Sequence, residues 1–304
     1  MSLACIFDSL MLDETLQNTQ QYEVVMNYDS QKEIINVLNE RGLRPTKKFG
    51  QNFMISRAAR EKVLSYIDIK EGDSVWEIGG GLGAMTSMAL DKVGQSGHLT
   101  VFEIDRGYID FLTEQFGSHP GFSIVSGDMV KTWRTVFEQS GRPDAIFGNL
   151  PYNSASAMIT QLIEGDCLAP HMVFTVQKEM GLRITAKPGS ADYSSFSVLC
   201  QLACDVSYQG DLKSGSFYPV PDVVSGIVTF TPKSGFREYA SKAVLKAIRD
   251  MFASRRKTLL NNLRTYGIEK VNSACQSLGI NPAARAETLS PLQIADLAKT
   301  LTTF

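Results

Sequence analysis

The sequence predicts an α/β protein with a smaller all-helical domain at its C-terminal end. Over residues 44–234, short runs rich in β-branched and aromatic residues alternate with helical patterns, which is typical of parallel βαβ units. A glycine-rich stretch at 79–83 follows the first of these runs, where such folds turn from strand into helix. From 235 to 304 the pattern is helical, with Gly267 and Gly279 as breaks. The 304 residues are enough for two domains, each with its own buried core.

Seven strands are expected in the larger domain. Their ranges are 74–78, 99–104, 122–125, 145–147, 172–176, 202–208 and 224–230. Helical patterns follow most of the first five, so those strands are expected to be parallel. The proline-rich stretch 217–221 is expected to be a loop, because proline cannot donate a hydrogen bond to a neighbouring strand.

Residues 1–43 form a separate acidic segment. They hold seven acidic against two basic side chains, a net charge of −5, which leaves +3 for the remainder of a chain whose formal net charge is −2. The apolar spacing around Ile34, Val37 and Leu38 predicts a helix that ends near Gly42. The sequence assigns this appended helical segment no function.

The basic side chains gather in two places. Arg44, Lys47 and Lys48 form one cluster, and residues 239–264 carry seven basic side chains against Asp250 alone. A charge run is usually only a solvated helix face, but two such clusters in a mildly acidic chain favour a partner with a phosphate backbone.

Several classes of protein find little support in the sequence. No stretch approaches the ~20 consecutive apolar residues of a membrane span, and acidic residues stand where a signal peptide needs positive charge, so a cytoplasmic protein is expected. The five cysteines contain no C-x-x-C pair and are interpreted as buried free thiols. The three histidines form no triad and no metal-ligand spacing, which argues against a hydrolase or a metalloenzyme.

A cofactor site is predicted where the first strands end. Trp76-Glu77-Ile78-Gly79-Gly80-Gly81-Leu82-Gly83 would let the backbone turn tightly and approach a ligand. Alone it also fits an empty turn or a dinucleotide site, since Gly79 and Gly81 match a relaxed dinucleotide fingerprint. Glu103 after the next strand can accept hydrogen bonds from both hydroxyls of an adenosyl ribose, and Asp128 can receive the adenine amine. Either acid could instead be a helix cap, but their placement after successive strands favours an adenosyl cofactor, S-adenosylmethionine.

Asn149-Leu150-Pro151-Tyr152 follows the fourth strand and predicts a site for an amine on a nucleic-acid base. An amine conjugated to adenine is a weak nucleophile. Carbonyl oxygens of the Asn149 side chain and of the backbone at Leu150 or Pro151 can hold its N–H groups and aim its lone pair at a methyl donor. Pro151 fixes the turn, and Tyr152 offers a face on which a flipped base can stack. The alternative for the isolated tetrapeptide is a β-turn with a packed tyrosine.

These motifs together resemble the KsgA family of small-subunit rRNA adenine dimethyltransferases, over residues 44–264. Further blocks carry the resemblance: Lys47-Lys48-Phe49-Gly50-Gln51-Asn52-Phe53-Met54, Gln177-Lys178-Glu179, Pro188-Gly189-Ser190-x-Asp192-Tyr193, Phe217-x-Pro-x-Pro-x-Val223-x-Ser225 and Phe252-Ala253-Ser254-Arg255-Arg256-Lys257-Thr258-Leu259. The family departs from this chain at Gly80, often proline there, and at Asp222 and Val224, often lysine and aspartate.

The resemblance implies a class I S-adenosylmethionine methyltransferase sheet of strand order 3-2-1-4-5-7-6 with a helical C-terminal domain. It implies dimethylation at N6 of two adjacent adenosines near the 3′ end of small-subunit (16S) rRNA. The implied cofactor contacts are Asn52, Met54, Gly79, Gly81, Glu103, Asp128 and Asn149. Phe217 would be a second aromatic wall opposite Tyr152, and Lys47, Lys48, Arg255, Arg256 and Lys257 would bind RNA.

Two other functions remain open from the sequence. An Erm-like methyltransferase of large-subunit rRNA shares the cofactor and target motifs, although the basic block at 255–257 favours the KsgA family. A catalytically silent assembly factor could keep the fold and the RNA surface, but it would not need Glu103, Asp128, Asn149 and Tyr152 together. The expected partner is small-subunit rRNA, alone or in a pre-assembled subunit, with no metal and no membrane.

Overall fold

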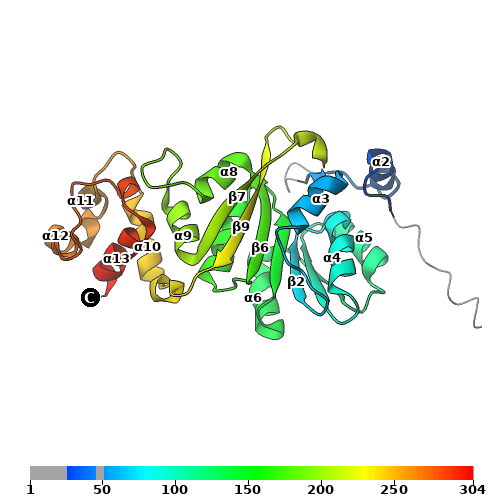
Figure 1. Cartoon of the computed structure of the whole chain (residues 1–304), viewed down its shortest axis with the longest axis horizontal. Coiled ribbons are helices and arrows are strands. Elements are labelled where there is room, and N and C mark those ends of the chain that lie inside the picture. The colour runs from blue at the N-terminus through cyan, green and yellow to red at the C-terminus, as the bar shows by residue number, and fades with distance from the viewer. Residues whose placement is uncertain (1–25, 46–50, 304) are drawn as a thin grey trace, which may run out of the picture.

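The computed structural model describes residues 26–45 and 51–303, and its centre is a seven-stranded mixed sheet (Figure 1). The strands follow the order β4-β3-β2-β5-β6-β9-β7. Their bounds are β2 Ser74–Ile78, β3 His98–Glu103, β4 Phe122–Ser126, β5 Ala145–Asn149, β6 His171–Gln177, β7 Cys204–Leu212 and β9 Ser225–Pro232. The first five are parallel, whereas β9 runs antiparallel to both β6 and β7. The order 3-2-1-4-5-7-6 is thereby confirmed.

Helices cover both faces of the sheet because alternate strand residues point to opposite sides. On one face, α3 Arg57–Leu64, α4 Ala84–Val93 and α5 Arg106–Phe116 bury apolar side chains against those of β2, β3 and β5. On the other face lie α6 Met129–Ser140, α7 Ala155–Glu164 and α9 Ser195–Ala203. The central strands β2, β3, β5 and β6 are buried along most of their length, which is typical of parallel strands covered on both faces.

The C-terminal region is helical and packs at the end of the molecule beyond α9 (Figure 1). Its elements are η4 Phe236–Tyr239, α10 Lys242–Met251, α11 Leu259–Asn262, η5 Arg264–Tyr266, α12 Ile268–Ser277, η6 Ala286–Thr288 and α13 Pro291–Thr302. Its buried side chains form one continuous cluster with those under α7 and α9. The expectation of a separate core is therefore wrong, because α10 and α13 lie directly against α9.

The strand predictions are confirmed to within a few residues at either end. The sixth predicted strand, 202–208, begins later, at Cys204, because α9 continues to Ala203. The expected loop at 217–221 is wrong for its first two residues. Phe217–Tyr218 form β8, which pairs antiparallel with β1 Phe53–Met54. Local sequence carries no signal for a pairing partner so far away along the chain.

The remaining expectations concern the N-terminal segment and the cysteines. Helix α2 Gln31–Glu40 confirms the predicted helix; residues 1–25, with Cys5, lie outside the described residues. The described cysteines are buried free thiols, as predicted: Cys167, Cys200, Cys204 and Cys275. Within the described ranges, no helix is both long and apolar enough to cross a bilayer.

Candidate active site

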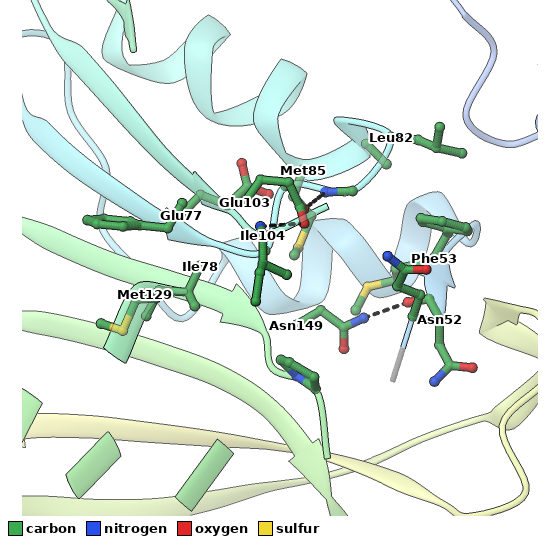
Figure 2. Close-up of a pocket in the computed structure, with 18 of the residues that line it drawn as sticks. Asn52, Phe53, Glu77, Ile78, Leu82, Met85, Glu103, Ile104, Met129 and Asn149 are labelled. Carbon is green, nitrogen blue, oxygen red and sulfur yellow. Dashed lines mark hydrogen bonds between the residues drawn. The ribbon is translucent and has the colours of Figure 1, made fainter. Parts of the chain in front are cut away.

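A cavity of about 250 Å³ opens where β2, β3, β4 and β5 end at their carboxyl edges. Polar side chains that the sequence singled out line it together with apolar ones (Figure 2). The predicted members in its wall are Asn52, Met54, Gly79, Gly81, Glu103, Asp128, Asn149 and Pro151. Parallel strands bring their ends to one edge, which is where open α/β sheets bind ligands.

The glycine-rich turn is shaped by close packing. Gly81 has a φ of +54°, and a Cβ there would lie 3.1 Å from the ring of Phe53. At Gly80 a Cβ would come within 2.5 Å of Val101 Cγ1 and 2.8 Å of Leu112 Cδ1. The proline that the family often carries at position 80 therefore has no room beside Val101 and Leu112.

Glu103 is a buried carboxylate held by the backbone around it. Its Oε2 accepts the Gly81 N–H at 2.9 Å, and its Oε1 accepts those of Ile104 and Asp105 at 2.8 and 3.0 Å. Burial raises the pKa of the Glu103 carboxyl, and the three N–H donors act against that rise because they stabilise the charged form. The carboxylate is thereby fixed at the centre of the cavity wall (Figure 2).

Asp128 is the N-cap of α6. Its Oδ1 accepts the Val130 N–H at 3.0 Å, so the helix-cap alternative is correct for this oxygen. The side chain also lines the cavity, and Oδ2 has no hydrogen-bond partner among the described residues. One carboxylate can thus both begin the helix and present an acceptor to a ligand.

Glu77 is a second buried carboxyl in the cavity wall, and the sequence alone predicts no function for it. It is 1% exposed, and its Oε2 accepts a hydrogen bond from Thr86 Oγ1 at 2.6 Å. Burial raises the pKa of Glu77 to about 8, and the nearby Glu103 adds to the rise. A charged side chain in an otherwise largely apolar strand is the sequence signal that could have identified Glu77.

Asn149 is oriented by a contact with the N-terminal motif. Its Nδ2 donates to the backbone carbonyl of Asn52 at 2.7 Å (Figure 2). Because the amide nitrogen is used in this way, the carbonyl Oδ1 is the end left to accept hydrogen bonds from a ligand. The contact bridges 97 positions of the chain.

The backbone carbonyls of the tetrapeptide differ in their availability. Pro151 O accepts the N–H groups of Ser154 and Ala155 at 3.1 and 3.0 Å as α7 begins. The Leu150 N–H donates to Thr175 O. The occupied Pro151 carbonyl favours Leu150 as the backbone acceptor for a ligand, and this choice stays a prediction.

The two predicted aromatic walls lie in different surroundings. Tyr152 is half-buried, and its hydroxyl lies 2.6 Å from the Oγ of the buried Ser225. Burial raises the pKa of the Tyr152 hydroxyl. Phe217 is 1% exposed and packs in the core with Met54 and Ile227, so the structure does not place its ring on the cavity surface. Its function as a stacking wall stays a prediction.

The predicted RNA-binding cations are not alike. Arg255 donates to the backbone carbonyls of Ser190 and Ala191, and its Nε lies 2.5 Å from Glu287 Oε2. Arg256 and Lys257 are exposed with no ion pair to described residues. Lys47 and Lys48 lie outside the described residues. No cluster of His, Cys, Asp or Glu suited to a metal occurs in the described part of the chain.

Known proteins resemble this chain over most of its length. Residues 42–303 match the family described as "Ribosomal RNA adenine dimethylase". "Ribosomal RNA small subunit methyltransferase A" of Treponema denticola is 40% identical over 273 residues, covering 87% of this chain and 92% of that protein. The protein of the same name from Geobacter sulfurreducens is 34% identical, covering 86% and 96%.

Solved structures show the same fold. A dimethyladenosine transferase from Plasmodium falciparum has a TM-score of 0.66 at 23% identity, covering 80% of this chain and 94% of its own. The 23S rRNA methyltransferase ErmE has a TM-score of 0.56 at 20% identity, covering 81% and 98%. At such identities these two show the fold alone. The match over 42–303 and the 40% identity confirm the resemblance seen in the motifs, and the chain belongs to the ribosomal RNA adenine dimethylase family.

Proposed function

We propose that this protein transfers methyl groups to N6 of two adjacent adenosines near the 3′ end of small-subunit rRNA, yielding N6,N6-dimethyladenosine. The observation that carries the proposal is Asn149, whose amide nitrogen is bound to Asn52 so that its carbonyl oxygen is left for the target amine. The cofactor is S-adenosylmethionine, which supplies an electrophilic methyl group on a sulfonium sulfur. The names of the relatives support the small subunit as the source of the substrate.

The cavity residues fit this cofactor. The fixed Glu103 carboxylate suits ribose hydroxyls, and Asp128 Oδ2 suits the adenine amine. Met129, on the opposite side of Figure 2 from Phe53 and Leu82, and Ile104, which lies between them, offer apolar contacts to the adenine ring. Asn52 and Met54 lie in the wall formed by the N-terminal motif.

Asn149 and Leu150 orient the target amine. Asn149 Oδ1 and Leu150 O accept its two N–H groups, which favours a pyramidal nitrogen with its lone pair directed away from them. The proton is released as the new N–C bond forms, to one of these carbonyls or to water, so no strong general base is required. The ring of Tyr152 supports the flipped base, and Ser225 fixes the hydroxyl of that ring.

The subunit methylation assay tests this proposal. Purified protein is incubated with S-adenosylmethionine and either unmethylated small subunits, large subunits or naked rRNA of each, and nucleosides are analysed by mass spectrometry. We expect N6,N6-dimethyladenosine in small-subunit rRNA only. Product in large-subunit rRNA would instead support the Erm-like function, and product in neither would support a non-catalytic assembly factor. We place the reaction in the cytoplasm, on small-subunit rRNA either alone or in a pre-assembled subunit, and the naked-rRNA samples of this assay separate the two.

The three basic side chains at 255–257 are expected to contribute unequally to RNA affinity. Replacing both Arg256 and Lys257 with alanine should weaken small-subunit RNA binding and lower the slope of log K against log salt by about 0.7 to 0.9 per cation, since fewer counterions are released. Filter binding at several salt concentrations measures the slope. Arg255→Ala should instead lower thermal stability, because that side chain holds the 190–191 backbone and Glu287.

The matched control replaces Lys92 and Lys131, two exposed cations on α4 and α6. If this pair and the Arg256/Lys257 pair change the salt slope equally, the cluster is a solvated surface and not an RNA contact.

A further inference from the structure

The N-terminal segment returns to the active site. Residues 26–43, here termed the N-terminal cover, include α2, and Tyr28 and Ile34 of this segment line the same cavity as Glu103 and Asn149. We propose that the N-terminal cover is part of the cofactor site and encloses the end that holds the amino-acid moiety of S-adenosylmethionine. The inference deepens the proposed function and rests on it.

Apolar packing fixes the cover to the glycine-rich turn. Ile34 and Leu38 are 1% and 3% exposed and share a cluster with Phe53, Leu82 and Tyr108. This cluster is separate from the two cores under the sheet. Its buried members come from the cover, β1, the turn and α5, so the cover packs in one cluster with Phe53 and Leu82 of the cavity wall.

Arg60 ties the cover to the cofactor wall. It lies on α3 and is 4% exposed, and its Nη1 donates to the backbone carbonyls of Tyr28 at 3.3 Å and Met54 at 3.0 Å. Its Nη2 pairs with Asp29. Burying a guanidinium is costly unless it is paired and hydrogen-bonded, and here its partners are Tyr28 and Met54, which both line the cavity. Arg60 is therefore a positioning residue for both segments.

A second tie holds the far end of the cover. Arg41 forms a two-bond ion pair with Glu114 of α5, with distances of 2.5 and 2.6 Å, and its guanidinium lies 5.7 Å from the centre of the Phe111 ring. Leu43 contacts α5 so closely that a Cβ on Gly107 would overlap it. Polar contacts therefore hold the cover to α3 at its N-terminal end and to α5 at its C-terminal end, and Ile34 lies between them.

The place of the cover decides which part of the cofactor it encloses. Asp128 and its chain neighbour Met129 mark the adenine end. Phe53 and Leu82 lie on the opposite side of Figure 2 from Met129. Ile34 packs with Phe53 and Leu82. The cover therefore adds an apolar wall at the end away from adenine, where it excludes water from the methylene groups and charges of the amino-acid moiety.

Two ligands that differ only in this moiety test the inference. S-Adenosylhomocysteine carries the amino-acid moiety, whereas 5′-methylthioadenosine keeps the thioether and lacks it. Isothermal titration calorimetry of the full chain measures the Kd for each ligand. In the Ile34→Ala variant, the Kd for S-adenosylhomocysteine is expected to rise about tenfold over wild type, and the Kd for 5′-methylthioadenosine less than twofold. Asp29→Asn keeps an oxygen that can accept from the buried Arg60, so it should give the same selective loss at about threefold with a thermal unfolding midpoint near that of wild type.

Ile294→Ala is the matched control, since Ile294 is equally buried but lies in α13 of the C-terminal region. Its affinity for both ligands should equal that of wild type. Suppose that wild type binds S-adenosylhomocysteine and that both cover variants bind it equally well. This result would overturn the proposed function of the cover but not the cofactor site, and so would an equal loss of affinity for both ligands. If the wild-type chain bound neither ligand, the cofactor site itself would fail, and the cover with it.

Discussion

Replacing Asn149 with alanine is expected to lower kcat for adenine methylation by about a thousandfold or more, while the Kd for S-adenosylmethionine rises by less than about tenfold. The side chain is preorganised: Asn52 O holds its Nδ2 at 2.7 Å, so Oδ1 needs no reorientation when the target amine arrives. Removing one preorganised dipole aimed at charge that develops in a transition state costs about a hundredfold to a thousandfold in comparable sites. Asn149 also aligns the lone pair, which adds to the loss.

Single-turnover methylation of small subunits measures kcat, and titration with cofactor measures Kd. The matched control is Asn262→Ala, because Asn262 likewise donates to backbone carbonyls, those of Met251 and Ser254, but lies in α11 of the C-terminal region. It should methylate at the wild-type rate. Turnover of the Asn149 variant within tenfold of wild type would contradict the assignment of Oδ1 as the acceptor.

Much of the fold could be predicted because its signals are local. Each central strand is a short apolar run, and the glycine-rich turn marks the first strand-to-helix junction. Asn149 was identifiable because it ends a strand, and strand ends meet at one edge of a parallel sheet. Glu103 was identifiable for the same reason.

The contacts that the sequence could not predict join residues far apart along the chain. The bond from Asn149 to Asn52 spans 97 positions, and that from Arg60 to Tyr28 spans 32. In the sequence, Arg255 cannot be distinguished from its basic neighbours. Only the fold shows that its guanidinium is bound to Glu287 and to the backbone carbonyls of residues 190–191. Composition gives the charge of a side chain, but its partners follow from tertiary packing.

Glu77 illustrates the same limit, because a single acid inside an apolar strand has no sequence signal for its protonation state. The chain around it removes water almost completely, at 1% exposure, and offers Thr86 Oγ1 as a hydrogen-bond donor. Desolvation exceeds that one favourable contact, so the pKa of Glu77 rises to about 8 in the folded protein. At neutral pH the folded state therefore keeps a neutral acid beside Glu103.

Burial of Glu77 is expected to make the free energy of unfolding fall as pH rises, and Glu77→Gln is expected to remove this contribution. Below the unfolded pKa of about 4.5, both states hold the proton and the group has no effect. Between about pH 4.5 and 8, the unfolded chain releases the proton while the folded protein retains it, so wild type loses up to about 1.4 kcal/mol of unfolding free energy per pH unit. Glutamine keeps the shape and an oxygen for Thr86 but does not titrate. The free energy of unfolding in urea, measured from pH 5 to 8, should rise for Glu77→Gln relative to wild type by roughly 3–4 kcal/mol over this range. The exposed control Glu138→Gln should show no such rise. If the unfolding free energies of wild type and Glu77→Gln instead changed in parallel with pH, Glu77 would be ionised in the folded state.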